Sequence, residues 1–560
     1  MLDFFIGDFI QQNKYTFLAY ILIILIFFPI EGVLLPNVYG TMFERFKTNV
    51  KVDNFGDIFT NIQKQNLPGM IVLLVLVWVV IIGSSYIKHQ VESFLVPEYM
   101  KYTRNAIYEK TIEAYSSDFR DMKTGEYLSR MLELTRNLKD LFQYTINRLI
   151  PESTVTVIIV LYLLFKQRSL GITIGITLLL CSIIQYYSSK TLIEKVKDRE
   201  EYFNSVVSEN IQDSLDNLMN VYLNNEVEMQ VNKNELLEKE SHRKMKHIMS
   251  FQNKVVSASE IVIIIGYGIS LYFIYTLLTT KKISVAEAIV YVLVVGQFVS
   301  YMINVNVGLV HNIFYKLGIV EASRSHLQTL LNMKTTKTKT DCIHKGNVKF
   351  KNVYFKYNKD SEDYLIQDMS FELQENKKYG IIGRSGSGKT TLMKLLVGLY
   401  PTDGGEITID GTDIQYIKQE YLREKVNYVN QKTSLFNEPI INNMLYGNDH
   451  ITEEEMISKL EKYKLLDVFS DLPDGIHASA GIHGNNLSGG MQKITMLMRG
   501  VVKPCKIMVL DEPLAGLDQN TRSKVIDMIN VEAEGKTLIV ITHDKEILPH
   551  MEQVIDVNKL

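Results

Sequence analysis

Residues 379–397 read Tyr-Gly-Ile-Ile-Gly-Arg-Ser-Gly-Ser-Gly-Lys-Thr-Thr-Leu-Met-Lys-Leu-Leu-Val, and this stretch decides the fold of the C-terminal part of the chain. The first four residues predict a buried strand, and residues 391–397 predict an apolar helix. Between them, residues 383–390 form a complete G-x-x-x-x-G-K-T sequence, the loop whose backbone N–H groups surround phosphate oxygens. The strand–loop–helix order therefore predicts an α/β nucleotide-binding domain.

The side chains of this loop have separate expected tasks. We expect Lys389 to reach the β- and γ-phosphates and the Thr390 hydroxyl to hold Mg²⁺. The N-terminus of the following helix adds a dipole that favours bound phosphate. The predicted nucleotide-contacting residues of the loop are Gly383, Arg384, Ser385, Gly386, Ser387, Gly388, Lys389, Thr390 and Thr391.

A second motif places two carboxylates after another buried strand. Residues 507–510 are Ile-Met-Val-Leu, and Asp511 and Glu512 follow at the carboxyl end, where open α/β sheets place their ligands. Asp511 suits the Mg²⁺ shell, and Glu512 points to the other side of the strand and suits the base that activates water. A solvated acidic turn is the alternative for this motif alone; together with the phosphate loop, the pair predicts nucleotide hydrolysis.

Further motifs carry a resemblance to a known family. The sequence Leu-Ser-Gly-Gly-Met-Gln at residues 487–492 resembles the signature of ATP-binding cassette (ABC) proteins. Other residues follow in that family's order: Tyr357 resembles the aromatic residue that stacks on adenine, Gln431 the Q-loop glutamine, Asp518 the D-loop aspartate, and His543 the switch histidine.

The resemblance implies ATP and Mg²⁺ as cofactors and a dimeric site. In this family the signature of one cassette completes the ATP site of another, so Ser488 and Gly490 would donate hydrogen bonds to the γ-phosphate held by the Lys389 of a second chain. Asp518 would also contact nucleotide. The implied catalytic residues are Glu512, His543 and Gln431. The implied metal ligands are Thr390, Gln431 and Asp511.

Two positions depart from the family pattern. Met491 stands where the signature usually has glutamine, and Ile482 stands where one branch of the family usually carries a glutamate that helps to couple the cassette to its other domain. Neither departure removes a group that performs chemistry. Because one chain contains every expected catalytic residue, two copies of it can form a working homodimer. A heterodimer with a second half-transporter, a different chain that has its own cassette, stays open.

The first 310 residues have a different character, with six long apolar stretches. A transmembrane helix needs roughly 20 apolar residues to cross roughly 30 Å of hydrocarbon. The predicted spans are 16–38, 69–87, 150–165, 170–187, 260–279 and 285–310. They predict an all-α six-helix transmembrane domain ahead of the α/β phosphate-loop domain, with residues 1–320 as the first, 321–345 as a linker and 346–560 as the second.

Long polar segments separate spans two and three and spans four and five. Their basic residues favour the cytosolic side, and an even number of spans then places both chain ends in the cytosol. Each segment is long enough for two helical stalks outside the bilayer. This layout resembles the exporter branch of multidrug, peptide and lipid transporters, with residues 119–130 and 213–226 similar to its two coupling regions.

Polar residues inside the spans are few. Glu31 follows Pro29 in span one and is either a functional intramembrane carboxylate or a residue near the outer interface beyond a helix end. Gln297, Ser300 and Asn304 share one face of span six and predict either a cavity lining or interhelical hydrogen bonds.

The sequence thus predicts a multi-pass membrane protein that exports a lipid, peptide or amphipathic molecule with ATP. A net charge of −3 gives no reason to expect nucleic acid as a partner, and the three cysteines have no metal-ligand spacing. An ATP-gated channel or regulatory membrane ATPase is the main alternative. A soluble cassette ATPase would need no spans, and nutrient importers usually keep membrane and ATP subunits on separate chains.

Overall fold

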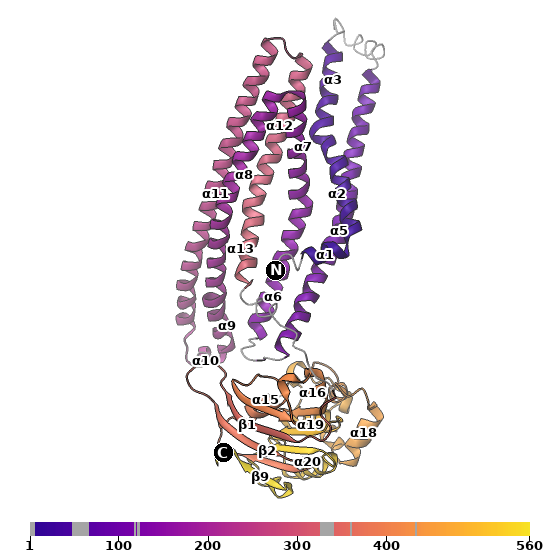
Figure 1. Ribbon diagram of the computed structural model, residues 1–560, viewed down its shortest axis with the longest axis vertical. Helices are drawn as coiled ribbons and strands as arrows, with labels where there is room; N and C mark the ends of the chain where they lie inside the picture. Colours follow the sequence, from indigo (N-terminus) through magenta and orange to yellow (C-terminus); the bar gives the residue numbers. More distant parts are fainter. Residues whose placement is uncertain are drawn as a thin grey trace. The chain divides into compact units, whose positions relative to one another are not determined.

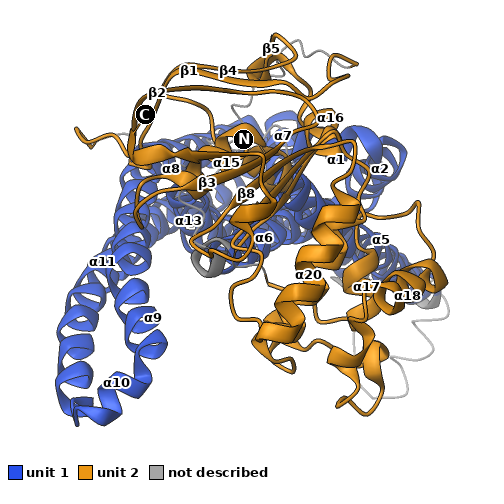
Figure 2. Ribbon diagram, turned by 90° about the horizontal axis from the view of Figure 1, so that it is seen from below, with its two compact units in different colours: residues 1–110, 123–331 blue, residues 111–122, 332–560 orange. Residues whose placement is uncertain are grey.

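The computed structural model describes residues 6–47, 67–116, 119, 124–324, 341–358, 361–431 and 434–559. The chain forms two compact units, Met1–Lys110 with Lys123–Leu331 and Thr111–Met122 with Asn332–Leu560 (Figure 2). The predicted linker lies mostly outside the described residues, so its boundaries stay predictions. Among the described residues, unit 1 is helical and the strands lie in unit 2, so the predicted fold class is confirmed.

Unit 1 consists of long helices, several of which are continued by short π-helical turns (Figure 1). Its elements are α1 (Asp8–Gln12), α2 (Lys14–Pro29), η2 (Ile30–Leu34), α3 (Leu35–Lys47), α5 (Leu67–Tyr115, whose last turn belongs to unit 2), α6 (Thr124–Tyr144), η3 (Thr145–Leu149), α7 (Ile150–Lys166), α8 (Arg168–Tyr202), η4 (Phe203–Ser208), α9 (Glu209–Asp216), α10 (Leu218–Leu223), α11 (Val227–Thr279), α12 (Val285–Gly308), η5 (Leu309–Phe314) and α13 (Tyr315–Ala322).

In the described part of the chain, six helical segments are long and apolar enough to cross a membrane. They are Lys14–Glu44, Gly69–Tyr115, Leu128–Lys166, Arg168–Asp216, Val227–Thr279 and Val285–Ala322. Each contains one predicted span, which confirms the six-helix prediction. Only 17% to 39% of the most apolar window of each segment is buried, as expected for helices whose other faces meet lipid or further helices.

Small and polar residues let the membrane helices pack closely. Figure 1 shows α8 and α11 side by side, and Gly266 of α11 lies directly against Thr177 of α8. The Gln185 amide donates to Asn306 of α12, and the Asn306 amide donates to the Val256 carbonyl oxygen of α11 over 3.3 Å. Hydrogen bonds between helices of this kind stabilise bundles in an apolar solvent.

Pro29 does not end the first span. The chain continues through η2 into α3, because a π-helical turn absorbs the carbonyl groups that the proline leaves without a donor. Glu31 lies in η2, which packs against α12, the helix that carries Tyr301. Glu31 therefore lies in a turn that contacts a neighbouring helix of the bundle.

The second long loop forms a helical hairpin with an apolar end. Figure 2 shows α10 at the turn between α9 and α11. Large apolar side chains are exposed there: Leu215, Leu218, Met219, Tyr222 and Leu223. We call these five residues the apolar tip. Exposed apolar patches of this kind mark interaction surfaces.

The described residues of unit 2 form two sheets. The antiparallel sheet has the order β2-β1-β4-β5, and the parallel sheet has the order β6-β7-β8-β3-β9. The strands are β1 (Val348–Phe355), β2 (Ile366–Leu373), β3 (Lys378–Ile382), β4 (Gly404–Ile409), β5 (Thr412–Asp413), β6 (Val426–Val429), β7 (Ile507–Asp511), β8 (Thr537–Ile541) and β9 (Gln553–Asp556). The helices are α15 (Lys389–Leu396), α16 (Gln419–Lys425), α17 (Ile440–Leu445), α18 (Glu453–Lys462), α19 (Gly489–Val501) and α20 (Gln519–Glu532).

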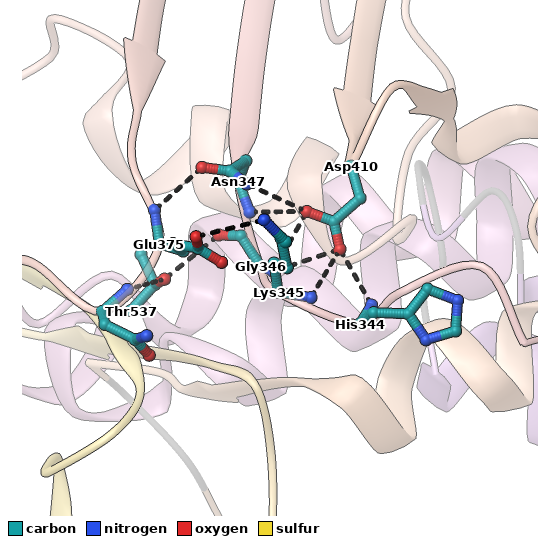
Figure 3. A network of polar contacts seen from close by, with 8 residues as sticks. His344, Lys345, Gly346, Asn347, Glu375, Asp410 and Thr537 are labelled. Atoms are coloured by element: carbon teal, nitrogen blue, oxygen red, sulfur yellow. Dashed lines mark hydrogen bonds and ion pairs between the residues drawn. The ribbon is translucent and has the colours of Figure 1, made fainter.

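A carboxylate ties the start of unit 2 to the antiparallel sheet (Figure 3). Asp410, in the turn after β4, accepts the backbone N–H groups of four successive residues, His344, Lys345, Gly346 and Asn347, over 2.8 to 3.1 Å. Burial alone would raise the pKa of Asp410, but these four donors outweigh it and lower that pKa.

The middle of the first long loop, Thr111–Met122, belongs to unit 2. The Phe119 backbone N–H donates to the Leu399 carbonyl oxygen over 2.9 Å, and the Arg423 guanidinium donates to the Ser116 carbonyl oxygen. Phe119 begins the first predicted coupling region; residues 120–123 of that region lie outside the described part of the chain.

Candidate nucleotide-hydrolysis site

The parallel sheet explains why residues far apart in sequence meet. Strands β6, β7, β8 and β3 are neighbours and run in the same direction. Their carboxyl ends therefore share one edge: Asp511 is the last residue of β7, and Gln431, His543 and the phosphate loop follow the ends of β6, β8 and β3. Ligands of open α/β sheets bind at this edge.

The phosphate loop holds its lysine in place. Gly386 and Gly388 adopt positive φ angles of 81° and 82°, which side chains disfavour. Lys389 is only 7% exposed, and its ammonium donates to the carbonyl oxygens of Gly383, over 2.9 Å, and Arg384, over 2.8 Å. Burial lowers the pKa of Lys389, while the nearby carboxylates act in the opposite direction.

The Asp511 carboxylate is almost fully buried, at 1% exposure. Its Oδ2 atom accepts the Thr390 hydroxyl over 2.7 Å, and its Oδ1 atom has no hydrogen-bond partner among the described residues. A buried oxygen without a partner beside a hydroxyl fits Mg²⁺, which prefers oxygen ligands and completes its shell with phosphate and water. No group of three or more His, Cys, Asp or Glu that could hold a metal occurs in the described ranges.

Glu512 and His543 face each other across neighbouring strand ends. Glu512 has a positive φ of 47°, and its N–H donates to the Ile541 carbonyl oxygen over 2.9 Å. Its Oε1 atom lies 3.9 Å from Nε2 of His543, and the Thr542 hydroxyl lies 3.4 Å from Oε2. The unusual backbone conformation directs the carboxylate toward the shared edge.

The predicted adenine-stacking residue and the Q-loop glutamine flank this centre. The Tyr357 ring is 40% exposed, and its hydroxyl lies 2.9 Å from the hydroxyl of Thr391 in α15. Gln431 is exposed, and its backbone N–H donates to the Asn430 side-chain oxygen over 2.8 Å. Residues 432 and 433 lie outside the described part of the chain.

The signature and D-loop residues stand at helix starts. Ser488 caps α19 by accepting the Met491 N–H over 3.3 Å, and a Cβ added to Gly490 would meet no neighbour closer than 3.9 Å. Asp518 caps α20 by accepting the Thr521 N–H over 3.0 Å. Ser488 is exposed, so this helix start is open to a ligand from outside the chain.

Two residues of the site were not found from the sequence. The Tyr428 hydroxyl lies 3.1 Å from Oδ2 of Asp511. The Lys493 ammonium, 5% exposed, lies 3.4 Å from the Asp511 carbonyl oxygen. Burial lowers the pKa of Lys493, while Asp511 and Glu512 act in the opposite direction. The sequence did hold a signal for Lys493, because it is a charged residue on the apolar face of the helix that follows the signature.

Comparisons with known proteins agree with this architecture. The family model "ABC transporter transmembrane region" matches residues 17–302, and "ABC transporter" matches residues 366–515. An export ATP-binding/permease protein of Rickettsia prowazekii is 25% identical over 87% of this chain and 84% of its own length. An ATP-dependent lipid A-core flippase of Saccharophagus degradans is 34% identical, over 38% of this chain and 36% of its own length.

A solved structure shares the fold of the whole chain. The structure of a bacterial Atm1-family ABC exporter with ATP bound has a TM-score of 0.81, with 19% identity over 97% of this chain and 93% of the other. The fold and site define a membrane-embedded, ATP-hydrolysing cassette protein. The chain belongs to the ABC transporter family. It is a multi-pass membrane protein and an ATPase coupled to transport, and its relatives are exporters.

Proposed function

We propose that this chain is one half of a dimeric exporter that moves a lipid, peptide or amphipathic molecule by alternating access. One observation carries the proposal. Lys389, Asp511 and Glu512 meet at one edge of the sheet, whereas the signature residue Ser488 is exposed at an open helix start. A complete ATP site then requires the signature of a second chain.

Within each site, the residues divide the work of hydrolysis. Lys389 binds the β- and γ-phosphates, and Glu512 takes the proton of the attacking water. His543, within 4 Å of Glu512, holds the γ-phosphate end of the site. Mg²⁺, when bound to Thr390, Asp511 and Gln431, offsets the charge that develops on the phosphates.

The other contacts to ATP are assigned to the residues predicted from the sequence. Tyr357 stacks on adenine, and the loop residues at 383–391 surround the phosphates. Ser488 and Gly490 of the second chain donate to the γ-phosphate, and Asp518 also contacts the nucleotide. A dimer closed over two nucleotides is favoured by ATP because ATP binds the closed state better than the open state.

The apolar tip supports a second copy of the chain as partner. Met219 is 74% exposed, and Ile482, which replaces the usual glutamate near the signature, is 64% exposed. Burying apolar surface is worth roughly 25 cal/mol per Å². We infer that the tip docks on the cassette of the second chain, so that closure of the cassettes moves the membrane helices.

The membrane domain supplies the expected substrate path. Ser300 and Asn304 of α12 are exposed in the single chain, while Phe298 and Met302 are buried. This polar face lines the transport cavity in the proposed dimer. The basic long loops favour a cytosolic cassette with both termini in the cytosol.

The test is Mg-ATP hydrolysis by the chain purified alone in lipid, with Glu512→Gln as the control. We expect hydrolysis that the substitution abolishes and that a transported lipid, peptide or amphiphile stimulates, together with its uptake into inverted proteoliposomes. Hydrolysis without uptake of any stimulating compound favours a gated channel or regulatory ATPase. Hydrolysis only after a second half-transporter is added favours a heterodimer.

A further inference from the structure

The hydroxyl of Tyr428 lies between the proposed metal ligand and the Q-loop. Tyr428 is the third residue of β6, the strand that pairs with β7 and ends just before Gln431. Its hydroxyl oxygen lies 3.1 Å from Oδ2 of Asp511 and 3.2 Å from Oδ1 of Asn430. Both neighbouring atoms are hydrogen-bond acceptors.

The orientation of the Asn430 amide follows from its other contact. The Gln431 backbone N–H donates to Oδ1 of Asn430 over 2.8 Å, so this atom is the amide oxygen. A tyrosine hydroxyl has one proton to donate. The Tyr428 proton can therefore satisfy Asp511 or Asn430, but not both at full strength.

The charges at each end decide which acceptor receives the proton. In the absence of a cation, the Asp511 carboxylate is the stronger acceptor because hydrogen bonds to an ionised group are stronger than those to a neutral amide. A cation held by Asp511 draws electron density from the carboxylate oxygens and repels a nearby proton. The neutral amide oxygen of Asn430 is then the better acceptor.

We propose that Tyr428 is a positioning residue that couples metal binding at Asp511 to the start of the Q-loop. When a cation binds, the Tyr428 O–H rotates, so that its hydrogen bond to Asp511 is replaced by one to Asn430. When the proton is on the Asn430 side, three groups are joined in series: the Tyr428 hydroxyl, the Asn430 amide oxygen and the Gln431 N–H. The start of the Q-loop is then held to the rigid strand β6. The inference rests on the proposed metal role of Asp511 and goes beyond it.

The strand geometry makes this contact specific to Tyr428. Side chains alternate along a strand, and Tyr428 is half-buried between Asn427, which donates to the Gly500 carbonyl oxygen, and Val429 in the core. Tyr428 is therefore the β6 residue whose hydroxyl touches both Asp511 and Asn430.

The experiment measures backbone amide hydrogen exchange of residues 426–431 in the full-length chain in lipid. A Glu512→Gln background keeps ATP intact, and samples contain ATP with EDTA or ATP with Mg²⁺. We expect Mg²⁺ to slow exchange at the start of the Q-loop about fivefold, the factor expected for one neutral hydrogen bond. Tyr428→Phe removes the hydroxyl and should remove this metal-dependent factor.

A matched control removes a hydroxyl elsewhere in unit 2. The Tyr421 hydroxyl contacts the backbone of Ile343, outside the site, so Tyr421→Phe should keep the metal-dependent protection. Asn430→Leu removes the other acceptor and should lose the protection as Tyr428→Phe does. Protection that persists in Tyr428→Phe, or that is lost equally in Tyr421→Phe, overturns the inference.

Binding of Mn²⁺, followed by electron paramagnetic resonance with ATP present, separates this inference from the proposal beneath it. Weak Mn²⁺ binding in Asp511→Asn, with a change of no more than about fivefold in Tyr428→Phe, supports both, because the coupling that slows exchange about fivefold acts equally on metal affinity. Unchanged Mn²⁺ binding in Asp511→Asn would refute the metal role of Asp511 and the inference with it. Intact Asp511-dependent binding together with an unchanged exchange response in Tyr428→Phe would refute the inference alone.

Discussion

At the scale of single residues, Asp410 anchors the start of unit 2 through four backbone N–H groups (Figure 3). Its pKa is lowered in the folded chain, so its stabilising effect is complete above its unfolded pKa of about 3.9. The effect is lost as the pH falls through the lower folded pKa. Asp410→Asn should cost about 1–3 kcal/mol at pH 7.

Thermal unfolding of the purified chain measures this effect. The melting temperature of Asp410→Asn should lie below that of the wild type at pH 7, and the gap should narrow below about pH 4. Asp471→Asn changes an exposed carboxylate in the same unit and serves as the control. Equal destabilisation by both substitutions would contradict the special role of Asp410.

Lys493 is expected to support ATP hydrolysis while adding nothing to the stability of the fold. Its ammonium is buried beside Asp511 without an ion pair within 4 Å among the described residues, and burying a charge that has no ion pair costs free energy. Lys493→Met should keep or raise the melting temperature. It should lower ATP hydrolysis about tenfold if the charge contributes about 1.4 kcal/mol at the carboxylates.

Melting temperature and steady-state hydrolysis, measured on the same preparation, check the prediction for Lys493. Lys462→Gln, which removes a lysine from the far end of α18, is the matched substitution. A large drop in melting temperature in Lys493→Met would instead assign the lysine a structural role.

The site residues divide into those that a sequence reveals and those that it does not. Lys389, Thr390 and Asp511 belong to motifs whose local order already defines strand, loop and helix, so their meeting was predicted. Tyr428 and Lys493 act because β6 pairs with β7 and because α19 packs its buried face on that sheet. Those pairings are tertiary, so the sequence marks Lys493 as a charge on an apolar helix face but does not place it or Tyr428 beside Asp511.

At the scale of helices, close packing of α8 and α11 depends on one small residue. A Cβ at Gly266 would overlap the Thr177 side chain, whereas a Cβ at Gly268 meets nothing within 4 Å. Overpacking a tight contact costs about 1–3 kcal/mol, and alanine favours a helix over glycine by about 1 kcal/mol. Gly266→Ala should therefore lower thermal stability in detergent, and Gly268→Ala should leave it equal or higher.

The apolar tip gives a second prediction for an element. Met219→Asp places a charge at an exposed apolar position of α10, and Asn220→Asp places the same charge on the neighbouring polar residue. Because a charge is costly to bury, Met219→Asp should uncouple transport from hydrolysis, leaving basal ATPase activity while substrate stimulation falls. Equal effects of the two substitutions would argue against docking of the tip.

At the scale of the whole molecule, the six spans and the cassette fold were predictable because both rest on composition and local motifs. The π-helical turn η2 within the predicted span 16–38 was not. Pro29 has the same local signature at a helix end and at a kink, and η2, which follows it, packs against α12, the helix that carries Tyr301. Contacts between helices far apart in sequence thus determine how Glu31 is placed.

The proposed dimer can be tested by mixing two inactive chains. Lys389→Ala disables a phosphate loop, and Ser488→Arg disables a signature. If each ATP site combines the loop of one chain with the signature of the other, each homodimer has two defective sites. A mixed dimer has one intact site, made from the loop of the Ser488→Arg chain and the signature of the Lys389→Ala chain.

Random pairing in a two-fold symmetric dimer should then restore up to about a quarter of the wild-type sites. Sites formed within a single chain would give no recovery, because every chain in the mixture carries one defect. Hydrolysis by the co-expressed pair, compared with each variant expressed alone at equal membrane levels, therefore decides whether the open helix start at Ser488 serves its own chain or a partner.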